Sequence, residues 1–472
     1  MIFTFALAVA LALQPSSAEV TVYNQGFGLV KETRILDLKV GRQSVAVEDV
    51  ASQIETNSVG IRSLTDPDGF TVLEQNYQYD LISPLAILNK SVGQKVRFIR
   101  TIGNQRDVLE GILISSPTSI VGNPDGSSQQ TYNGMVIRTD DGRIVLSPSG
   151  EIEVSSVPAG LISKPTLLWE IDAAKPGQNT IELSYLTQGM NWNADYVLMY
   201  DGVGRGDLKG WVTMSNQSGI GFKGAKLKLL AGDVARVVAE RQVRDEMSMD
   251  SARPMNAPAA FKEESLFEYH LYTLQRPATI RNNETKQLSL LEGKGIQITK
   301  KLIIDSMQGY TNYYPSEGEV GTGSLKPQVR LEFVNSLENN LGIPLPKGNV
   351  KIYQRDNSGS VQMLGEAAID HTPKNEKLSL VVGQSFDIRA DRKRTNFRRI
   401  NDTTTEESFE IAVRNRKDVA DTVHVYERHW GSWNVTEKSM PFEKLDSDTM
   451  DFVVNLKAGE SRTITYTVVT NW

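Results

Sequence analysis

The sequence contains no cysteine in 472 residues. This absence excludes disulfides, thiolate metal ligands and cysteine nucleophiles. It also excludes a bacterial lipoprotein, because the lipid of such a protein is attached to a cysteine. Basic residues are fewer than acidic ones, 51 against 57, which gives a formal net charge of -6. A nucleic-acid-binding protein needs a basic surface, so this charge balance argues against one.

Long apolar runs are also scarce. One run of signal-peptide length, residues 2–13, precedes the small residues Ser16, Ser17 and Ala18 and then Glu19. The usual positive start of an export signal is missing, because no lysine or arginine precedes Lys31. We expect residues 1–18 to be a signal peptide and the protein to be exported to the periplasm or cell surface, with no integral membrane span after cleavage. A retained amino-terminal anchor is the alternative.

The clearest pattern in the sequence is alternation of apolar and polar residues. In Ala225–Leu230 lysines alternate with leucines, and Ala194–Tyr200 and Leu208–Met214 alternate in the same way between turns rich in Gly, Asn and Asp. A period of two predicts strands, and a polar second face is typical of antiparallel sheets with one side in solvent. We therefore predict an all-β fold built from antiparallel sheets. The glycines of Gly202–Gly206 are interpreted as turn residues, because no helix follows them to receive a phosphate.

Length and pattern together predict several domains, since 472 residues are too many for one core. Five short strand patterns within residues 89–163 indicate a small SH3-like barrel, with one more sandwich layer as the alternative. Residues 234–262 are expected to be a flexible insertion, because the strand period stops there and Pro254 and Pro258 disfavour a helix. The predicted domains are a signal peptide at 1–18, an N-terminal β module at 19–88, the small barrel at 89–163, a first β-sandwich at 164–316 and a C-terminal β-sandwich at 325–472, both sandwiches being immunoglobulin-like.

Three segments of the central region carry a family resemblance: GMNWNADYVL at 189–198, GWVTMSNQSG at 210–219 and KLKLLAGDV at 226–234. With further segments at 271–274, 344–353, 370–374 and 466–472, the region from Lys164 onward resembles the domain-of-unknown-function 4139 family. Related bacterial proteins are often described as mucoidy-inhibitor-like, so the resemblance implies a cell-envelope context. It implies no site residue, because that family has no established catalytic residues.

Metal binding is considered for the four histidines and for three methionines. His424 and His429 lie five residues apart, so in one strand they point to opposite faces, and His270 and His371 lie far away in the sequence. We therefore predict no zinc site. The methionines of residues 234–262 could bind copper(I) on a flexible segment, because thioether sulfur suits that ion, or they could be incidental residues of a linker. They are Met247, Met249 and Met255.

The densest basic run and the carboxylates supply the other candidate sites. The basic run could contact phosphate or a polyanionic glycan, or it could be a solvated hairpin paired with nearby acids such as Asp387, Asp391, Glu406 and Glu407. A glycosidase needs only two carboxylates at the right separation, which the sequence cannot locate. A cleft lined by such a pair and by Trp192, Trp211 or Trp433 would favour that activity. The basic run comprises Arg389, Arg392, Lys393, Arg394, Arg398 and Arg399.

The sequence therefore predicts an exported, envelope-associated binding or scaffold protein that docks a protein or glycan partner. It predicts no catalytic, cofactor-binding or metal-binding residue and no cofactor. An envelope hydrolase with a carboxylate pair between domains is the alternative, and a copper-handling protein that uses the methionines is a third.

Overall fold

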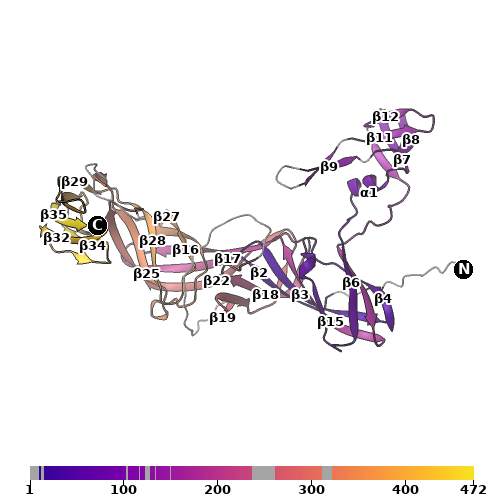
Figure 1. Ribbon diagram of the computed structural model, residues 1–472, viewed down its shortest axis with the longest axis horizontal. Coiled ribbons are helices and arrows are strands. Elements are labelled where there is room, and N and C mark those ends of the chain that lie inside the picture. Colours follow the sequence, from indigo (N-terminus) through magenta and orange to yellow (C-terminus); the bar gives the residue numbers. More distant parts are fainter. Residues whose placement is uncertain are drawn as a thin grey trace. The chain divides into compact units, whose positions relative to one another are not determined.

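The structure is a computed structural model. It describes residues 10–11, 15–102, 105–115, 117–122, 128–132, 134–148, 150–236, 261–310 and 321–472. The described chain is almost entirely strand and forms several separate sheets, which confirms the predicted all-β, multi-domain fold (Figure 1). Among the described residues, no helix has the length and hydropathy needed to cross a membrane.

The chain divides into two compact units that interleave in sequence. Unit 1 comprises Met1–Asn191, Ser215–Lys228 and Pro277–Glu284, and unit 2 comprises Trp192–Met214, Leu229–Arg276 and Thr285–Trp472. Strands from the expected module at 19–88 pair in unit 1 with strands that follow residue 164. The sequence-based boundaries at 88 and 164 therefore separate strands that the structure places in common sheets.

Two sheets of unit 1 show this pairing. In one, β3 (Phe27–Leu38) lies between β2 (Ser17–Tyr23) and β15 (Gly177–Gln188), and β15 also pairs with β5 (Gly60–Ser63). In the other, the strand order is β1-β4-β14-β6. Its strands are β1 (Ala10–Leu11), β4 (Gly41–Glu48), β14 (Thr166–Ala173) and β6 (Phe70–Gln78), and unit 1 also contains the pair of β18 (Phe222–Ala231) with β21 (Ala278–Ile280).

A small module is inserted between β6 and β14. All five strands expected there are present, in an antiparallel sheet of order β12-β11-β8-β7-β13. Among the described residues this sheet does not close into an SH3-like barrel, because β12 and β13 lie at its two ends and do not pair with each other. The strands are β7 (Lys95–Ile102), β8 (Gln105–Leu113), β11 (Val136–Thr139), β12 (Ile144–Leu146) and β13 (Glu151–Val154).

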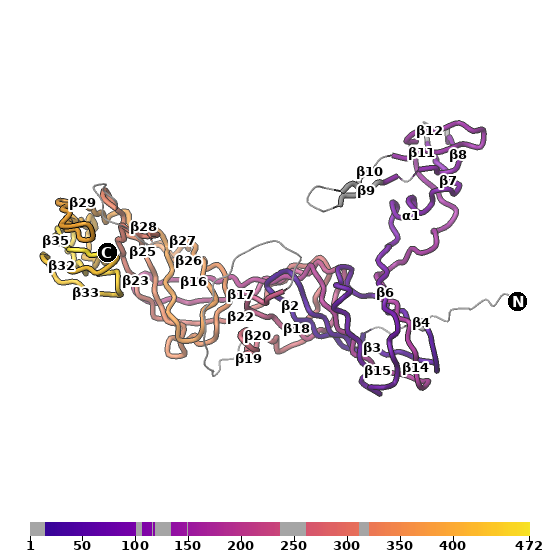
Figure 2. The backbone as a smooth tube through the Cα atoms, in the orientation of Figure 1, coloured from indigo at the N-terminus to yellow at the C-terminus, as the bar shows by residue number. Residues whose placement is uncertain are grey.

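Two further elements of the module were not predicted. One is the hairpin in which β9 (Thr118–Gly122) pairs with β10 (Ser128–Tyr132). Figure 2 shows β7, β8, β11 and β12 of the same module close together. The helix α1 (Pro84–Lys90) begins after Ser83, whose Oγ accepts a hydrogen bond from the amide of Ala86 at 3.1 Å. Serine followed by proline is a helix-start signal, so the sequence contained the information for α1.

Unit 2 contains a five-stranded sheet and the hairpin of β19 with β20. The sheet has the order β22-β17-β16-β26-β27, and the hairpin pairs β19 (Phe261–Leu266) with β20 (Tyr269–Leu274). The pair of β16 with β26 is parallel, which corrects the expectation of purely antiparallel sheets. The strands of the sheet are β16 (Met190–Tyr200), β17 (Arg205–Asn216), β22 (Glu284–Gln297), β26 (Gly348–Arg355) and β27 (Val361–Ile369).

The rest of unit 2 is a β-sandwich whose two sheets enclose one hydrophobic core. One sheet has the order β28-β25-β23-β31-β34-β33 and the other β24-β29-β30-β35-β32. Because β23 precedes residue 325 and pairs in parallel with β31, this sandwich also departs from the expected boundary and from purely antiparallel pairing. The strands are β23 (Thr299–Asp305), β24 (Gly323–Leu325), β25 (Gln328–Val334), β28 (Lys377–Gln384), β29 (Ile388–Arg399), β30 (Thr404–Asn415), β31 (Asp421–Arg428), β32 (Ser432–Lys438), β33 (Glu443–Lys444), β34 (Thr449–Leu456) and β35 (Ser461–Asn471).

The predicted faces of the central strands are confirmed. In β16 the side chains of Tyr196, Leu198 and Tyr200 are buried, and in β18 Leu227 and Leu229 are buried. The flexible insertion predicted at 234–262 lies mostly outside the described residues, although Phe261 and Lys262 belong to β19.

Candidate functional site: a buried arginine–glutamate network

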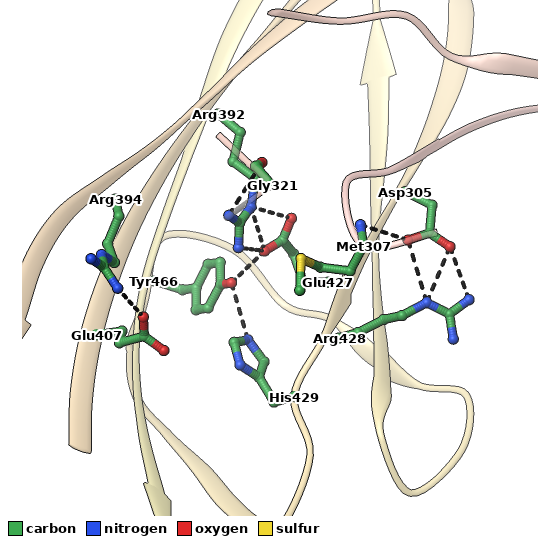
Figure 3. A network of polar contacts seen from close by, with 10 residues as sticks. All are labelled: Asp305, Met307, Gly321, Arg392, Arg394, Glu407, Glu427, Arg428, His429 and Tyr466. Carbon is green, nitrogen blue, oxygen red and sulfur yellow. Dashed lines mark hydrogen bonds and ion pairs between the residues drawn. The ribbon is translucent and has the colours of Figure 1, made fainter. Parts of the chain in front are cut away.

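The strongest concentration of buried charge lies in the core of the C-terminal sandwich, where β29 places two arginines on its inner face. Residues two apart in a strand share a face, so Arg392 and Arg394 both point inward while Lys393 points to solvent. Figure 3 shows Arg392 facing Glu427 and Arg394 facing Glu407. Arginines inside a sandwich need partners, because an unpaired buried charge is very costly.

Arg392 is held by several groups at once. Its Nε lies 3.0 Å from each carboxylate oxygen of Glu427, and its Nη2 lies 2.7 Å from Oε2. Its guanidinium carbon also lies 4.0 Å from the centre of the Phe409 ring, a favourable cation–π position. The planar fork of arginine suits a carboxylate in this geometry, which a lysine could not reproduce.

Tyr466 and His429 extend the network. The hydroxyl of Tyr466, from β35, donates a hydrogen bond to Oε2 of Glu427 at 2.5 Å, and Nε2 of His429 lies 3.1 Å from the same hydroxyl. Because the Tyr466 proton is used toward Glu427, the neighbouring ring nitrogen of His429 has the role of donor. The four groups therefore form one connected chain of hydrogen bonds.

Burial shifts the titration of these groups. Desolvation, with Arg392 as a second cause, lowers the pKa of His429 to about 3, so this ring is neutral in the folded protein. Burial, with Glu427 next, raises the pKa of Tyr466 well above its ordinary value, and burial also raises the pKa of Glu407. The pKa of Arg392 is raised by Glu427 and Tyr466 in spite of its desolvation. These shifts keep His429 neutral, Tyr466 protonated and Arg392 charged.

Two more ion pairs flank this chain. Nη1 of Arg394 lies 2.9 Å from Oε1 of Glu407, and both side chains are buried. Nη2 of Arg428, at the end of β31, lies 2.9 Å from Oδ2 of Asp305, and Nη1 of Arg428 donates to the hydroxyl of Thr449 at 3.3 Å. The arginines of the network are thus matched by carboxylates from other strands.

A small pocket opens beside the network, with a volume of about 10 Å³. This is room for about one water molecule and far less than a sugar ring requires. The two buried glutamates of the network, Glu407 and Glu427, are both bound to arginine, so neither is a free carboxylate of the kind a glycosidase uses. The arrangement therefore suits a role in holding the two sheets together. The pocket is lined by Met307, Arg392, Arg394, Glu407, Phe409, Arg428 and His429.

A second buried arginine–glutamate pair lies in unit 1. Arg34 donates from Nε and Nη2 to Oε2 of Glu32, and its Nη1 and Nη2 donate to the carbonyls of Glu48 and Asp49. Burial raises the pKa of Glu32, whose Oε1 has no hydrogen-bond partner among the described residues. Both units therefore place an arginine–glutamate pair inside a β-rich core.

The predicted basic run is divided by strand alternation. Arg392 and Arg394 are buried as described, whereas Arg398 is exposed and lies 2.9 Å from a carboxylate oxygen of Glu406. Asp391 pairs with Arg414. Arg394 and Arg398 therefore pair with nearby acids, as one of the two interpretations of this run expected, but the expectation of a solvated hairpin is wrong for Arg392 and Arg394, whose side chains are buried.

The histidines lie apart, as their spacing predicted for His424 and His429. Nδ1 of His424 lies 2.7 Å from Oδ2 of Asp451 on the outer face of β31, while His429 faces the core. Nδ1 of His270 lies 2.8 Å from Glu263, and Nδ1 of His371 accepts from the amide of Lys347 at 3.3 Å. Among the described residues, no group of three or more histidine or acidic side chains is placed to hold a metal ion.

The remaining sequence candidates have ordinary structural positions. Trp192 is buried and donates to the carbonyl of Leu230, and Trp433 donates to the carbonyl of Ser447, while Trp211 is exposed on β17. The glycine-rich loop at 202–206 is a turn, in which Oδ1 of Asp201 accepts from three successive amides. Met247, Met249 and Met255 lie outside the described residues.

Sequence reasoning missed Glu427 and Tyr466, which complete the network. Each follows its own strand period, so the alternation within β31 and β35 predicts inward-facing side chains. Nothing in the sequence pairs them with Arg392, because the three residues come from three strands. No protein-family model matches the chain, and no curated protein matches it either. The resemblance given above therefore carries no site residue to this structure.

Proposed function

We propose that this is an exported, envelope-associated binding or scaffold protein of the domain-of-unknown-function 4139 type, and that it docks a partner protein. Export and envelope context rest on the apolar run at residues 2–13 and on the family resemblance. The binding role rests on one structural observation, the exposed apolar edge of the small module.

That edge is β12. It lies at one end of its sheet and pairs only with β11 among the described strands. Ile144 and Leu146 share one face of it and are 52% and 71% exposed. Large apolar side chains on an edge strand invite another chain to add a strand, which is a common mode of peptide recognition. An apolar edge suits a protein segment better than a glycan, whose hydroxyls need polar partners.

The interior of the C-terminal sandwich supports binding over hydrolysis. Its buried glutamates Glu407 and Glu427 face arginines, and the adjoining pocket has room for about one water molecule. The charged side chains inside that domain therefore hold its strands together. Partner binding is expected at exposed surfaces such as β12.

The test is chemical cross-linking in intact cells with a tagged full-length protein that carries Ile144→Asp and Leu146→Asp. We expect one reproducible partner with the native chain and at least tenfold less with the double variant. Val203→Asp is the matched control, because Val203 is an equally apolar residue that is exposed in a turn of unit 2. Recovery of sugar instead of protein, or equal capture by the double variant, would contradict the proposal.

A further inference from the structure

A second exposed apolar surface lies at the tip of the hairpin formed by β19 and β20. The two strands pair from Phe261 with Leu274 to Leu266 with Tyr269, which leaves Phe267 and Glu268 as a two-residue loop. Phe267 is 84% exposed and its neighbour Leu266 is 48% exposed. The tip therefore presents two adjacent apolar side chains to solvent.

The backbone of this loop is unfavourable for the residue it holds. Phe267 has φ of +57°, whereas Glu268 is not among the residues with positive φ. A two-residue loop with positive φ at its first position has the φ pattern of a type II′ turn, where glycine is preferred. A bulky residue at positive φ is uncommon, because its Cβ approaches the carbonyl oxygen. The chain thus keeps an aromatic ring where local stability favours glycine.

The base of the hairpin is well supported, so the exposed tip is not a frayed end. Nδ1 of His270 lies 2.8 Å from Oε1 of Glu263 across the two strands. The Tyr269 ring contacts the Phe267 ring at 6.0 Å between centroids. The side chains of Phe261, Leu271 and Leu274 are buried. A rigid hairpin with a strained aromatic tip has the form of a preorganised anchor.

Charge around the tip limits the kind of partner. Residues 262–268 contain one lysine and three glutamates, and Glu264 and Glu268 are exposed beside the apolar pair. Anionic lipid headgroups would repel these carboxylates, whereas a protein pocket with a basic rim would attract them. A central aromatic with a polar surround is the usual composition of a binding hot spot.

We propose that Phe267 and Leu266 insert into an apolar pocket with a lysine- or arginine-rich rim on a partner protein. This inference rests on the proposed binding function but uses a different element from β12. Strain at Phe267 is retained because the ring contributes to binding, and Glu264 and Glu268 orient the tip by charge.

The test places a photo-reactive phenylalanine analogue at position 267 of the full chain in cells, with the same analogue at position 386 as control. Phe386 is 83% exposed and has no positive φ, so it matches Phe267 in type and exposure. We expect a single protein adduct from position 267, at least tenfold above position 386. We also expect mass spectrometry to map the cross-link to a site on the partner that has lysine or arginine residues next to it.

Two variants separate this proposal from its rivals. Glu264→Lys with Glu268→Lys should lower the adduct yield at least tenfold, and Phe267→Gly should lower recovery of the same partner while leaving the protein folded. An adduct only with lipid, with a second copy of the chain or with the chain itself overturns the proposal, as does a yield unaffected by charge reversal. If the analogue at Leu146 captures a protein and position 267 does not, this inference fails and the proposed function stands. If neither position captures a protein, both fail.

Discussion

Arg392 and Glu427 form an ion pair across the two sheets of the C-terminal sandwich, with side chains only 3% and 1% exposed. Arg392 comes from β29 and Glu427 from β31, and these strands belong to different sheets. The pair therefore connects the two layers of the core by charge as well as by apolar packing. Removal of one partner leaves the other charge buried, which is costly even where the intact pair itself adds little.

Loss of Glu427 should destabilise the protein strongly. We expect Glu427→Gln to lower the free energy of unfolding by about 3–5 kcal/mol, because Arg392 loses its counter-charge inside the core. Glu406→Gln is the control, since its partner Arg398 is 62% exposed, and it should change the free energy by less than about 1 kcal/mol. Urea unfolding of both variants measures the difference. Equal effects would show that the buried pair has no special role.

The buried, neutral His429 should make the free energy of unfolding of the sandwich fall in acid. Its pKa is about 3 in the folded protein, below the ordinary value of 6.5, so between these limits the unfolded chain binds a proton that the folded chain does not. Stability contributed by this residue is therefore fully present above pH 6.5 and falls by about 1.4 kcal/mol per pH unit toward pH 3.

Comparison with His429→Phe isolates this effect. The raised pKa of Glu407 acts in the opposite sense, because its folded form keeps a proton that the unfolded chain loses as the pH rises above 4.5. Subtraction of the variant's curve from that of the native chain removes the contribution of Glu407. We expect the difference to slope upward with pH between about 3 and 6.5. A flat difference would mean that the pKa of His429 is the same in the folded and unfolded chains.

Gly348 should not tolerate a side chain. It lies at the start of the parallel pair of β26 with β16, and an added Cβ would overlap the carbonyl oxygen of Ala194. We expect Gly348→Ala to cost about 1–3 kcal/mol through forced backbone shifts. Gly383→Ala in β28 is the control, because nothing lies within 4 Å of its added Cβ, and it should change stability by less than about 1 kcal/mol. Thermal unfolding of the two variants decides between crowding and a general effect of glycine replacement.

Replacement of the hairpin anchor should stabilise the isolated protein. Phe267→Gly relieves the positive-φ strain and should raise the free energy of unfolding by about 1 kcal/mol. Phe386 has similar exposure but no positive φ. Phe386→Gly should therefore lower the free energy of unfolding by up to about 1 kcal/mol, because glycine gives the unfolded chain greater freedom. Urea unfolding measures both. A loss at position 267 would mean that the ring stabilises the hairpin itself.

The sequence by itself determined where many of the strands lie, because period-two alternation is a local property of each strand. It identified the five strands in the main sheet of the small module and the buried faces of β16 and β18. It also determined that His424 and His429 face opposite sides. Strand alternation is consistent with Arg392 and Arg394 sharing a face of β29, but it did not place that face in the core, since a basic run satisfies the same period on either side of a sheet.

Only the tertiary structure decided which strands pair and which charges meet. Arg392, Glu427 and Tyr466 come together because β29, β31 and β35 face one core, and no local pattern relates positions so far apart in the chain. The same holds for the parallel pair of β16 with β26 and for the pairing of β3 with β15 across the inserted module. Long-range strand pairing depends on the summed burial of many side chains, which a single stretch of sequence does not contain.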